Sequence, residues 1–577
     1  MSFVGRKDAL ALLGASSGLL TALPWLAGHP EYLATLAASA AGGAYVGWKK
    51  AGRWMDRTDT RSREGFILPS DPTFPASLGA GGLRLGYTRD KGLPVDIENG
   101  WLMRHSAIIG QSGVGKTTIG EYMLWSQMVR GGGWLFVDAK LDVETRDKLA
   151  HMARLLGRED DFYVLNVDDP DNSHSYNPIL AGDGDEVASR LLNLLPSSEN
   201  NIGADFYKQQ ANQALTVIVS ALQKAKYRYH FGDLSIALQS ARAIEALERL
   251  VPEGSPEKRA LQVFLDQFRR RTKEGTQLDV NKLKEVLGGM AGRIAMFAQG
   301  KFGRVFNTYS PEINLTDIIL GNKMLYVMLP TMGKDVAALN LGKLVLSDLR
   351  TAVYNVQALP KYRRPTPPFL AFLDEMGSYV MPGIARLFEQ ARSANICLIP
   401  AFQSFANLSS VSPDFADMIV QNTWNKILFK FGSKDSPEMA ADIIGKTIRF
   451  QKTMSLSKSE SNSSPLLRTV PQSAESAGGG VGVSWKEQEE YRVSPDQLKS
   501  LGIGEAVVMS GARMFHINTP MLKFPDVVPE FKAIRHPTRV PQGEETLDFE
   551  SRYRQFLMDA GVEGDKKSGE ACSVDGG

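Results

Sequence analysis

The chain has 577 residues, of which 43% are hydrophobic and 23% charged, and this composition excludes an intrinsically disordered protein. Its length is too great for a single hydrophobic core, so several domains are expected. A formal net charge of +2 excludes a strongly basic surface overall, so any contact with nucleic acid must come from a local basic region. Two cysteines exclude a disulfide-stabilised scaffold.

Two uncharged segments lie near the N-terminus, at residues 9–28 and 32–48. Each approaches the roughly 20 apolar residues that span a bilayer. Lysine and arginine flank the pair on both outer sides, so the positive-inside rule places both ends in the cytoplasm. We therefore predict a two-helix transmembrane hairpin within residues 1–55. A cleaved signal peptide is the alternative, and it would export the nucleotide-binding motif described next to a compartment without ATP.

Residues 110–117 read GQSGVGKT and match the P-loop pattern GxxxxGK[ST]. An apolar strand pattern precedes them and a helical pattern follows. The glycines let backbone N–H groups surround phosphate oxygens, and the helix N-terminus adds positive potential. Lys116 is expected to reach the β and γ phosphates, and the Thr117 hydroxyl to bind Mg²⁺. A tight turn that binds nothing is the alternative. The predicted cofactors are ATP and Mg²⁺, and the predicted binding residues are Gly110, Gln111, Ser112, Gly113, Val114, Gly115, Lys116, Thr117 and Thr118.

Apolar runs alternate with helical patterns up to residue 167 and again from residue 324. This alternation predicts an α/β fold with a doubly wound parallel sheet. Residues 183–303 show helical patterns and no strand pattern, which predicts an all-α insertion domain. The basic run at residues 269–273 could contact nucleic acid, although a solvated helix face is the commoner meaning of such a run.

The apolar run at residues 368–373 ends in Asp374 and Glu375. In P-loop enzymes the first acid helps to hold Mg²⁺, and a following glutamate orients or deprotonates the attacking water. Acids also cap ordinary strand ends, which is the alternative for this pair. The P-loop upstream favours the catalytic interpretation.

Two more polar side chains lie downstream of these acids. Gln403 follows the predicted strand 396–402, at the edge of the sheet where ligands of α/β proteins bind, so it could sense the γ-phosphate. Arg392 ends the predicted helix 383–393 and could be an arginine finger for a neighbouring subunit's nucleotide. An ordinary edge amide and a surface cation are the alternatives.

The remainder of the chain is predicted from its composition. Residues 454–485 are rich in serine and glycine and predict a mobile loop. The expected domains are the hairpin at 1–55, a nucleotide-binding domain in two parts at 56–182 and 304–535, the all-α domain at 183–303, and a mostly disordered tail at 536–577.

The order of these features resembles that of the TraD/TraG-type coupling proteins of type IV secretion systems. The membrane hairpin comes first, His105 precedes the P-loop strand, and Asn177-Pro178-Ile179 resembles the family's Asn-Pro-Leu element. The helical insertion, Asp374-Glu375 and Gln403-Ser404 then follow in the family's order. The resemblance covers about residues 1–530.

This resemblance implies a hexameric ATPase with a RecA-like motor domain, held in the bacterial inner membrane by two helices with both termini cytoplasmic. It implies that Lys116 and Thr117 bind nucleotide and Mg²⁺, that Asp374 and Glu375 form the Walker B pair, and that Gln403 is the sensor. Arg392 matches the family's arginine after the Walker B helix, with Ala391 in place of the usual glycine. The implied partners are single- or double-stranded DNA, the relaxase or relaxosome, the type IV secretion inner-membrane complex, the membrane and further copies of the chain.

From these features we predict an ATPase that couples ATP hydrolysis to transfer of single-stranded DNA during conjugation. A protein-effector receptor of the same family would carry the same motor, and a basic, DNA-stimulated channel would separate the two. A chromosome-segregating translocase is related, but such motors usually carry more membrane helices and a winged-helix end. A non-motor scaffold would keep the fold and tolerate loss of Glu375.

Overall fold

The structure is a computed structural model that describes residues 82–195, 202–272, 275–331, 335–380, 384–459, 478–549 and 551–552. These residues belong to one compact unit, Ser70–Gly577. The predicted membrane hairpin at residues 9–48 lies outside the described residues. Within the described ranges, no helix is both long enough and apolar enough to cross a membrane.

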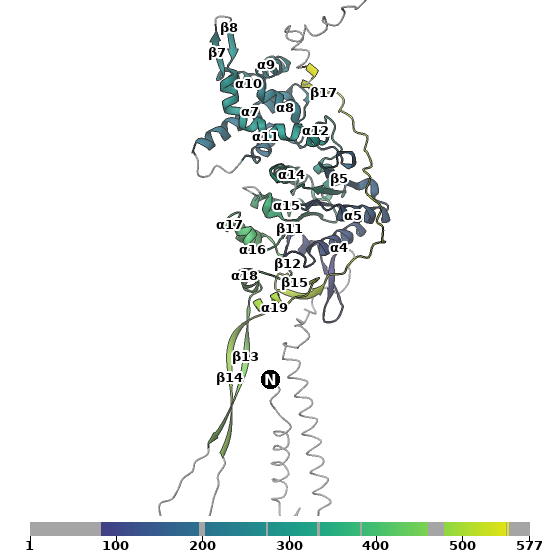
Figure 1. Cartoon of the computed structure of the whole chain (residues 1–577), viewed down its shortest axis with the longest axis vertical. Helices are drawn as coiled ribbons and strands as arrows, with labels where there is room; N and C mark the ends of the chain where they lie inside the picture. Colours follow the sequence, from purple (N-terminus) through teal and green to yellow (C-terminus); the bar gives the residue numbers. More distant parts are fainter. Residues whose placement is uncertain are drawn as a thin grey trace, which may run out of the picture. The chain divides into compact units, whose positions relative to one another are not determined.

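An 11-stranded sheet forms the centre of this unit, in the order β2-β1-β16-β15-β12-β3-β11-β10-β4-β9-β5 (Figure 1). From β12 to β5 every neighbouring pair is parallel, whereas β2, β1, β16 and β15 extend the sheet by antiparallel pairing. The predicted RecA-like α/β fold with a large parallel sheet is confirmed. The strands are β1 (Leu83–Thr88), β2 (Pro94–Ile97), β3 (Ser106–Ile109), β4 (Trp134–Asp138), β5 (Phe162–Asn166), β9 (Met324–Met328), β10 (Phe369–Leu373), β11 (Ile396–Phe402), β12 (Asn425–Leu428), β15 (Glu505–Ser510) and β16 (Arg513–Asn518).

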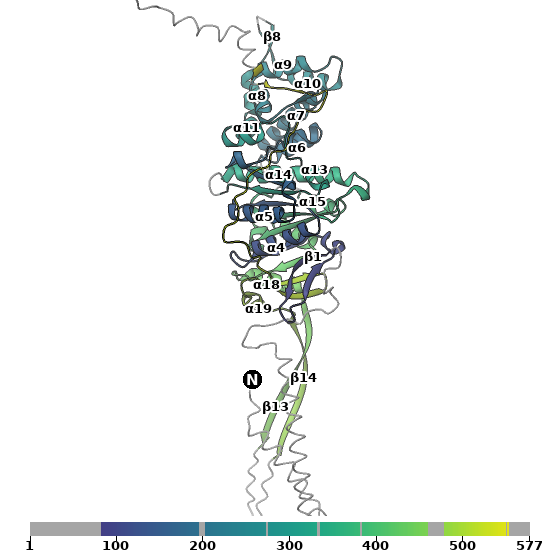
Figure 2. The same ribbon diagram turned by 90° about the vertical axis from the view of Figure 1, so that its right-hand side faces the viewer.

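Helices cover both faces of the parallel strands, which explains why β3, β4, β5, β9, β10 and β11 are buried along their whole length. Figures 1 and 2 show α4 (Lys116–Val129) and α5 (Val143–Leu155) on one face, and α14 (Asp335–Gln357) and α15 (Ala385–Ala391) on the other. Under α4 and α5 the rings of Phe136 and Phe372 lie edge to face, with centroids 4.9 Å apart. The remaining helices of this part are α3 (Asn99–Leu102), α13 (Leu315–Leu320), α16 (Phe405–Ser409), α17 (Pro413–Asn422), α18 (Asp435–Ile444) and α19 (Pro495–Lys499).

Helices predominate in residues 184–306, which we call the helical domain. The segment also contains β6 (Tyr227–Arg228) and a hairpin of β7 (Arg269–Thr272) and β8 (Gly275–Leu278), where the sequence predicted no strand. The expected helix face at residues 269–273 is therefore wrong. Helix α10 ends at Asp266, and at the start of β7 Arg269 pairs with Glu248 and Asp266 at 2.9 and 2.6 Å. The helices are α6 (Gly184–Leu192), α7 (Ile202–Lys224), α8 (Phe231–Gln239), α9 (Ala241–Leu250), α10 (Pro256–Asp266), α11 (Val280–Ala298) and α12 (Gly300–Phe306).

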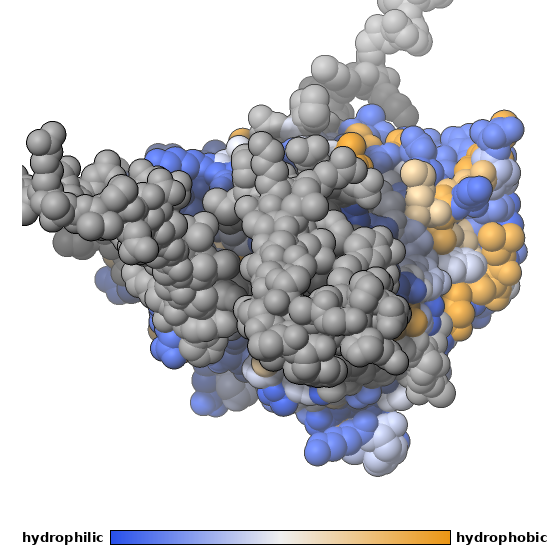
Figure 3. Space-filling model, turned by 90° about the horizontal axis from the view of Figure 1, so that it is seen from below, coloured by the Kyte–Doolittle hydropathy of each residue, from blue (hydrophilic) through white to orange (hydrophobic). Residues whose placement is uncertain are grey.

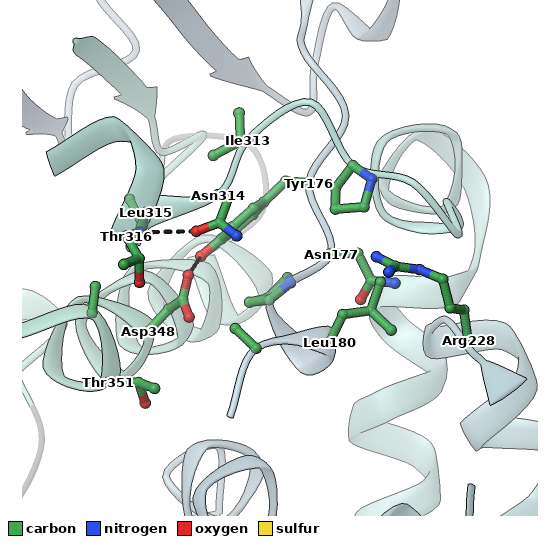
Figure 4. Close-up of a pocket in the computed structure, with 14 residues that line it drawn as sticks. Tyr176, Asn177, Leu180, Arg228, Ile313, Asn314, Leu315, Thr316, Asp348 and Thr351 are labelled. Atoms are coloured by element: carbon green, nitrogen blue, oxygen red, sulfur yellow. Dashed lines mark hydrogen bonds between the residues drawn. The ribbon is translucent and has the colours of Figure 1, made fainter. Parts of the chain in front are cut away.

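A buried polar network joins the helical domain to the sheet domain beside a cavity of about 190 Å³ (Figure 4). The Tyr176 hydroxyl donates to Asp348 Oδ2 at 2.6 Å, and Arg190 Nη2 lies 3.4 Å from Asp348 Oδ1. Burial raises the pKa of Asp348, and the charge of Arg190 opposes that shift. Asn177, in the Asn-Pro-Ile element, donates to the carbonyls of Tyr229 and Thr308 at 2.9 and 2.7 Å. This element therefore ties the helical domain to the sheet domain.

The predicted mobile loop at residues 454–485 is wrong for the part that the structure describes. Residues 454–459 end β13 (Lys446–Ser459), and residues 478–485 begin β14 (Gly478–Tyr491), which pairs with β13 along its whole length. A long two-stranded ladder is held by backbone hydrogen bonds, which a composition rich in serine and glycine does not reveal. Residues 460–477 of the predicted loop lie outside the described residues.

Residues 519–549 form an extended segment that we call the strap. In Figure 1 it is the yellow trace that runs along the outside of the molecule from the sheet to the helical domain. The predicted disordered tail from residue 536 is therefore wrong as far as residue 549. Leu547 and Phe549 are completely buried, and the Phe549 N–H donates to Asp233 Oδ1 at 2.8 Å. Beside them β17 (Glu545–Thr546) pairs with β6 of the helical domain. Phe531, earlier in the strap, is also buried, and its ring centroid lies 5.5 Å from that of Phe162 in β5.

Other apolar side chains in this part of the chain stay exposed. Ile503 is 84% exposed, and Met521 and Val527 in the strap are 78% and 83% exposed. Figure 3, which views the molecule from below Figure 1, shows orange hydrophobic patches among blue hydrophilic surface toward the right of the picture. Because Val527 is exposed, its substitution can serve as a control for substitution of the buried Phe549 in the same segment.

We expect Phe549→Ala to release the end of the strap, because removing a fully buried phenylalanine costs about 3–5 kcal/mol. Hydrogen–deuterium exchange should show lost protection at residues 545–549 and at β6 while the central sheet stays protected. Val527→Ala is the control and should change nothing, since that side chain is 83% exposed. Unchanged protection in Phe549→Ala would show that the strap does not depend on this anchor.

Candidate nucleotide-binding site

The P-loop lies between β3 and α4, at the edge where the parallel strands end. Gly113 and Gly115 have φ of +78° and +110°, a region that glycine enters without steric cost. A Cβ on Gly110 would stand 2.5 Å from the Cβ of Phe429, so this position also needs glycine. The Gly110 N–H donates to the Phe402 carbonyl at 3.2 Å, which fixes the loop against β11. These contacts explain the glycine spacing of the motif.

The Lys116 ammonium lies across the loop and donates to the Gly110 and Gln111 carbonyls at 2.6 and 3.0 Å. Burial lowers the pKa of Lys116, and the charges of Asp374 and Glu375 oppose that shift. Thr117 and Thr118 are half-buried in the first turn of α4, whereas Ser112 and Gly113 are exposed. A lysine, two hydroxyls and the N-terminus of a 14-residue helix around an open loop fit a phosphate group.

Asp374 and Glu375 follow β10, whose neighbour on one side is β4. The Asp374 N–H donates to the Val137 carbonyl at 3.0 Å, so the carboxylate stands beside the end of β4. Burial raises the pKa of Asp374, and the charge of Lys140 opposes that shift. Glu375 has φ of +52°, which is unusual for a residue with a side chain. The backbone therefore turns sharply and presents the two carboxylates together.

The structure places Gln403 against Glu375. Its Nε2 donates to Glu375 Oε1 at 2.6 Å, across the gap between the ends of β11 and β10. Gln403 therefore holds the carboxylate in a fixed direction. The P-loop, the acid pair and Gln403, predicted from separate stretches of sequence, lie along one edge of the sheet.

Three further residues of the site, Asp138, Lys140 and Tyr326, were not predicted from the sequence. Asp138 accepts the backbone N–H groups of Lys140 and Asp142 at 2.9 and 2.8 Å and the Tyr326 hydroxyl at 2.7 Å. The turn formed in this way presents Lys140, whose Nζ lies 3.0 Å from Asp374 Oδ2. Burial acts to lower the pKa of Lys140, but the charges of Asp374, Glu375 and Asp138 and the hydrogen bond to Asp374 together raise it. The sequence did contain one indication of these residues, because β4 ends in an acid, Asp138, just as β10 is followed by the acid Asp374.

Arg392 does not join this group. It is exposed at the C-terminal end of α15, just before β11 begins, whereas the P-loop is beside the end of β11. Nearby, His105 donates from Nε2 to the Phe388 carbonyl at 2.6 Å and accepts the Leu398 N–H at Nδ1 at 3.1 Å. Burial lowers the pKa of His105 to about 4, so the ring is neutral and holds α15 to the start of β3. Arg392 therefore lies at the opposite edge of the sheet from its own P-loop.

Comparison with known proteins gives a family match and a relative. A family model described as the TraM recognition site of TraD and TraG matches residues 368–501. The type 4 coupling protein DotL of Legionella pneumophila is 24% identical over 406 residues, which are 63% of this chain and 51% of DotL. The chain thus spans about half the length of this relative.

Solved structures of similar fold include the conjugative coupling protein TrwBdeltaN70 in an unbound form, with 15% identity, a TM-score of 0.49, and coverage of 81% of this chain and 99% of that chain. TrwB in complex with ADP and Mg²⁺ gives 15% identity, a TM-score of 0.47, and coverage of 78% and 91%. The family match and the similarity to DotL confirm the resemblance predicted from the sequence: the chain is related to the type IV coupling proteins.

Proposed function

We propose that the chain is an ATPase that couples ATP hydrolysis to the transfer of single-stranded DNA, with its bound relaxase, into a type IV secretion channel. The observation that carries the ATPase activity is the meeting of Lys116, the Asp374–Glu375 pair and Gln403 at one edge of the sheet. The family description, which names recognition of TraM by TraD and TraG, supports the relation to the coupling proteins, and transfer of DNA is the part that the assays below test.

Each residue has a distinct task in this proposal. Lys116 and the backbone N–H groups of residues 110–118 bind the phosphates, while Thr117 and Asp374 hold Mg²⁺. Among the described residues no group of three or more His, Cys, Asp or Glu could hold a metal, so phosphate oxygens and water would complete the coordination of Mg²⁺. Bound Mg²⁺ neutralises charge that develops on the phosphates. Glu375, oriented by Gln403, directs the attacking water.

The finer parts of the proposal come from the family resemblance. Residues 9–48 anchor the protein in the bacterial inner membrane, where it meets the secretion complex. Six copies form a ring, and Arg392 of one copy reaches the nucleotide of the next. The position of Arg392 at the far edge of the sheet supports this arrangement, because a side chain there is remote from its own P-loop.

ATPase assays of the purified full chain in detergent test the proposed substrate. We expect single-stranded DNA to raise the hydrolysis rate several-fold, with a smaller effect from duplex DNA, and the stimulation to weaken as salt rises because phosphate contacts are electrostatic. ATP hydrolysis that neither kind of DNA alters would contradict a DNA motor and favour the receptor for protein effectors.

Two substitutions separate nucleotide binding from hydrolysis. Lys116→Ala should weaken ATP binding by about tenfold or more, since it removes charge-assisted hydrogen bonds to phosphate. Glu375→Gln should bind ATP normally and hydrolyse it at less than about 1% of the wild-type rate, because it removes only the group that acts on water. Titration with a fluorescent ATP analogue and a phosphate-release assay measure the two effects. The control is Glu389→Gln, an exposed change on α15. If Glu375→Gln hydrolyses ATP normally, the assigned role is wrong.

Mixing two inactive variants tests whether Arg392 acts between subunits. Lys116→Ala keeps the finger and lacks a competent P-loop, whereas Arg392→Ala keeps the P-loop and loses rate on the order of 10³ or more. After confirmed co-assembly some interfaces join an intact P-loop to an intact Arg392, so ATPase activity should reappear. Activity that stays at the level of the single variants would eliminate the finger.

A further inference from the structure

The turn after β4 holds Lys140 in a fixed position. Asp138 binds the N–H groups on both sides of the turn, and Leu141 adopts φ of +56°. From the neighbouring strand end, the Thr331 hydroxyl donates to the Ala139 carbonyl at 2.6 Å. The carboxylate of Asp138 is thus committed to shaping the turn. The one side chain that this turn delivers to the acid pair is that of Lys140.

The Lys140 ammonium lies between the two acids, 3.0 Å from Asp374 Oδ2 and 4.0 Å from Glu375 Oε1. Lys116, by contrast, has its ammonium bound to carbonyls of its own loop. Lys140 is therefore the cation that pairs directly with Asp374. Its side chain is 44% exposed, whereas that of Asp374 is 6% exposed, so the lysine can change its partner while the acid stays in place.

We infer that Lys140 is a second phosphate-binding lysine, which is held on Asp374 when no nucleotide is bound and moves to the terminal phosphate of ATP. The inference rests on the proposed ATPase function. A divalent cation and an ammonium repel each other on one carboxylate, so Mg²⁺ held at Asp374 would displace Lys140. The triphosphate supplies the nearest new anion, and the flexible four-carbon stem of lysine allows the move. Since ADP lacks the terminal phosphate, Lys140 favours ATP over ADP.

The test compares Lys140→Met with a matched control. Lys140→Met keeps the length of the stem and removes the charge. Lys148→Met removes another ammonium that pairs with a carboxylate, Glu144 at 2.6 Å, on the surface of α5. Fluorescent analogues of ADP and of non-hydrolysable ATP are titrated into the purified full chain, with the Mg²⁺ concentration varied, and hydrolysis is measured separately.

At saturating Mg²⁺ we expect Lys140→Met to bind the ATP analogue about tenfold more weakly and ADP with unchanged affinity, because only ATP loses a charge-assisted contact to its terminal phosphate. The Mg²⁺ concentration needed for half-maximal ADP binding should fall, since the competing ammonium is gone, and kcat should fall about tenfold. Lys148→Met should match the wild type in all four measurements. If Lys140→Met fails to fold, Lys140→Gln keeps a hydrogen bond to Asp374 and should show the same loss of preference for ATP.

An unchanged ratio of ATP to ADP affinity in the folded variant would overturn the inference and leave Lys140 as a counter-ion of the acid pair. This failure differs from failure of the proposed function. In the latter case the wild-type chain itself would not bind or hydrolyse ATP.

Discussion

Parallel pairing of the central strands is the constraint on which the rest of the molecule depends. Because β3, β11, β10 and β4 are neighbours that run in one direction, residues far apart in the sequence leave the sheet along the same edge. Leu373 pairs with Val137 and Phe402 with Ile109, so Asp374, Asp138, Gln403 and the P-loop follow in adjacent positions. A register shift of one residue would turn these side chains toward the opposite face.

Charge neutralisation is the second requirement of this edge. The carboxylates of Asp138, Asp374 and Glu375 stand close together, and each has a different partner: backbone N–H groups and Tyr326 for Asp138, Lys140 for Asp374, and Gln403 for Glu375. Desolvation penalises every charge here, so an unpaired acid would be expensive. Lys140 is the more exposed member of its pair with Asp374, and for this reason the proposed change of partner is assigned to the lysine.

Much of this could be predicted from the sequence, since the P-loop, the strand ending in Asp374 and Glu375, and the alternation of strands and helices are local patterns. From the sequence, Gln403 and Glu375 could be placed at the same edge of the sheet, but their hydrogen bond could not be predicted. Lys140 could not be predicted as a site residue, because its position beside Asp374 depends on which strand neighbours β10, and strand order is not a local property of the sequence. The strap and the hairpins β7–β8 and β13–β14 were missed for a related reason. Neither the burial of a particular side chain such as Phe549 nor a ladder of backbone hydrogen bonds can be predicted from amino-acid composition.

The polarity of the sheet also decides what one chain can do alone. Strand β11 carries Arg392 before its first residue and Gln403 after its last, so a single chain presents a nucleotide site at one edge and a free guanidinium at the other. His105 makes that far edge rigid by binding the Phe388 carbonyl and the Leu398 N–H, one on α15 and the other on β11. An exposed arginine at this edge is remote from the P-loop of its own chain. In the proposed ring it would complete a site when a second copy approaches with its P-loop edge, so hydrolysis would depend on assembly.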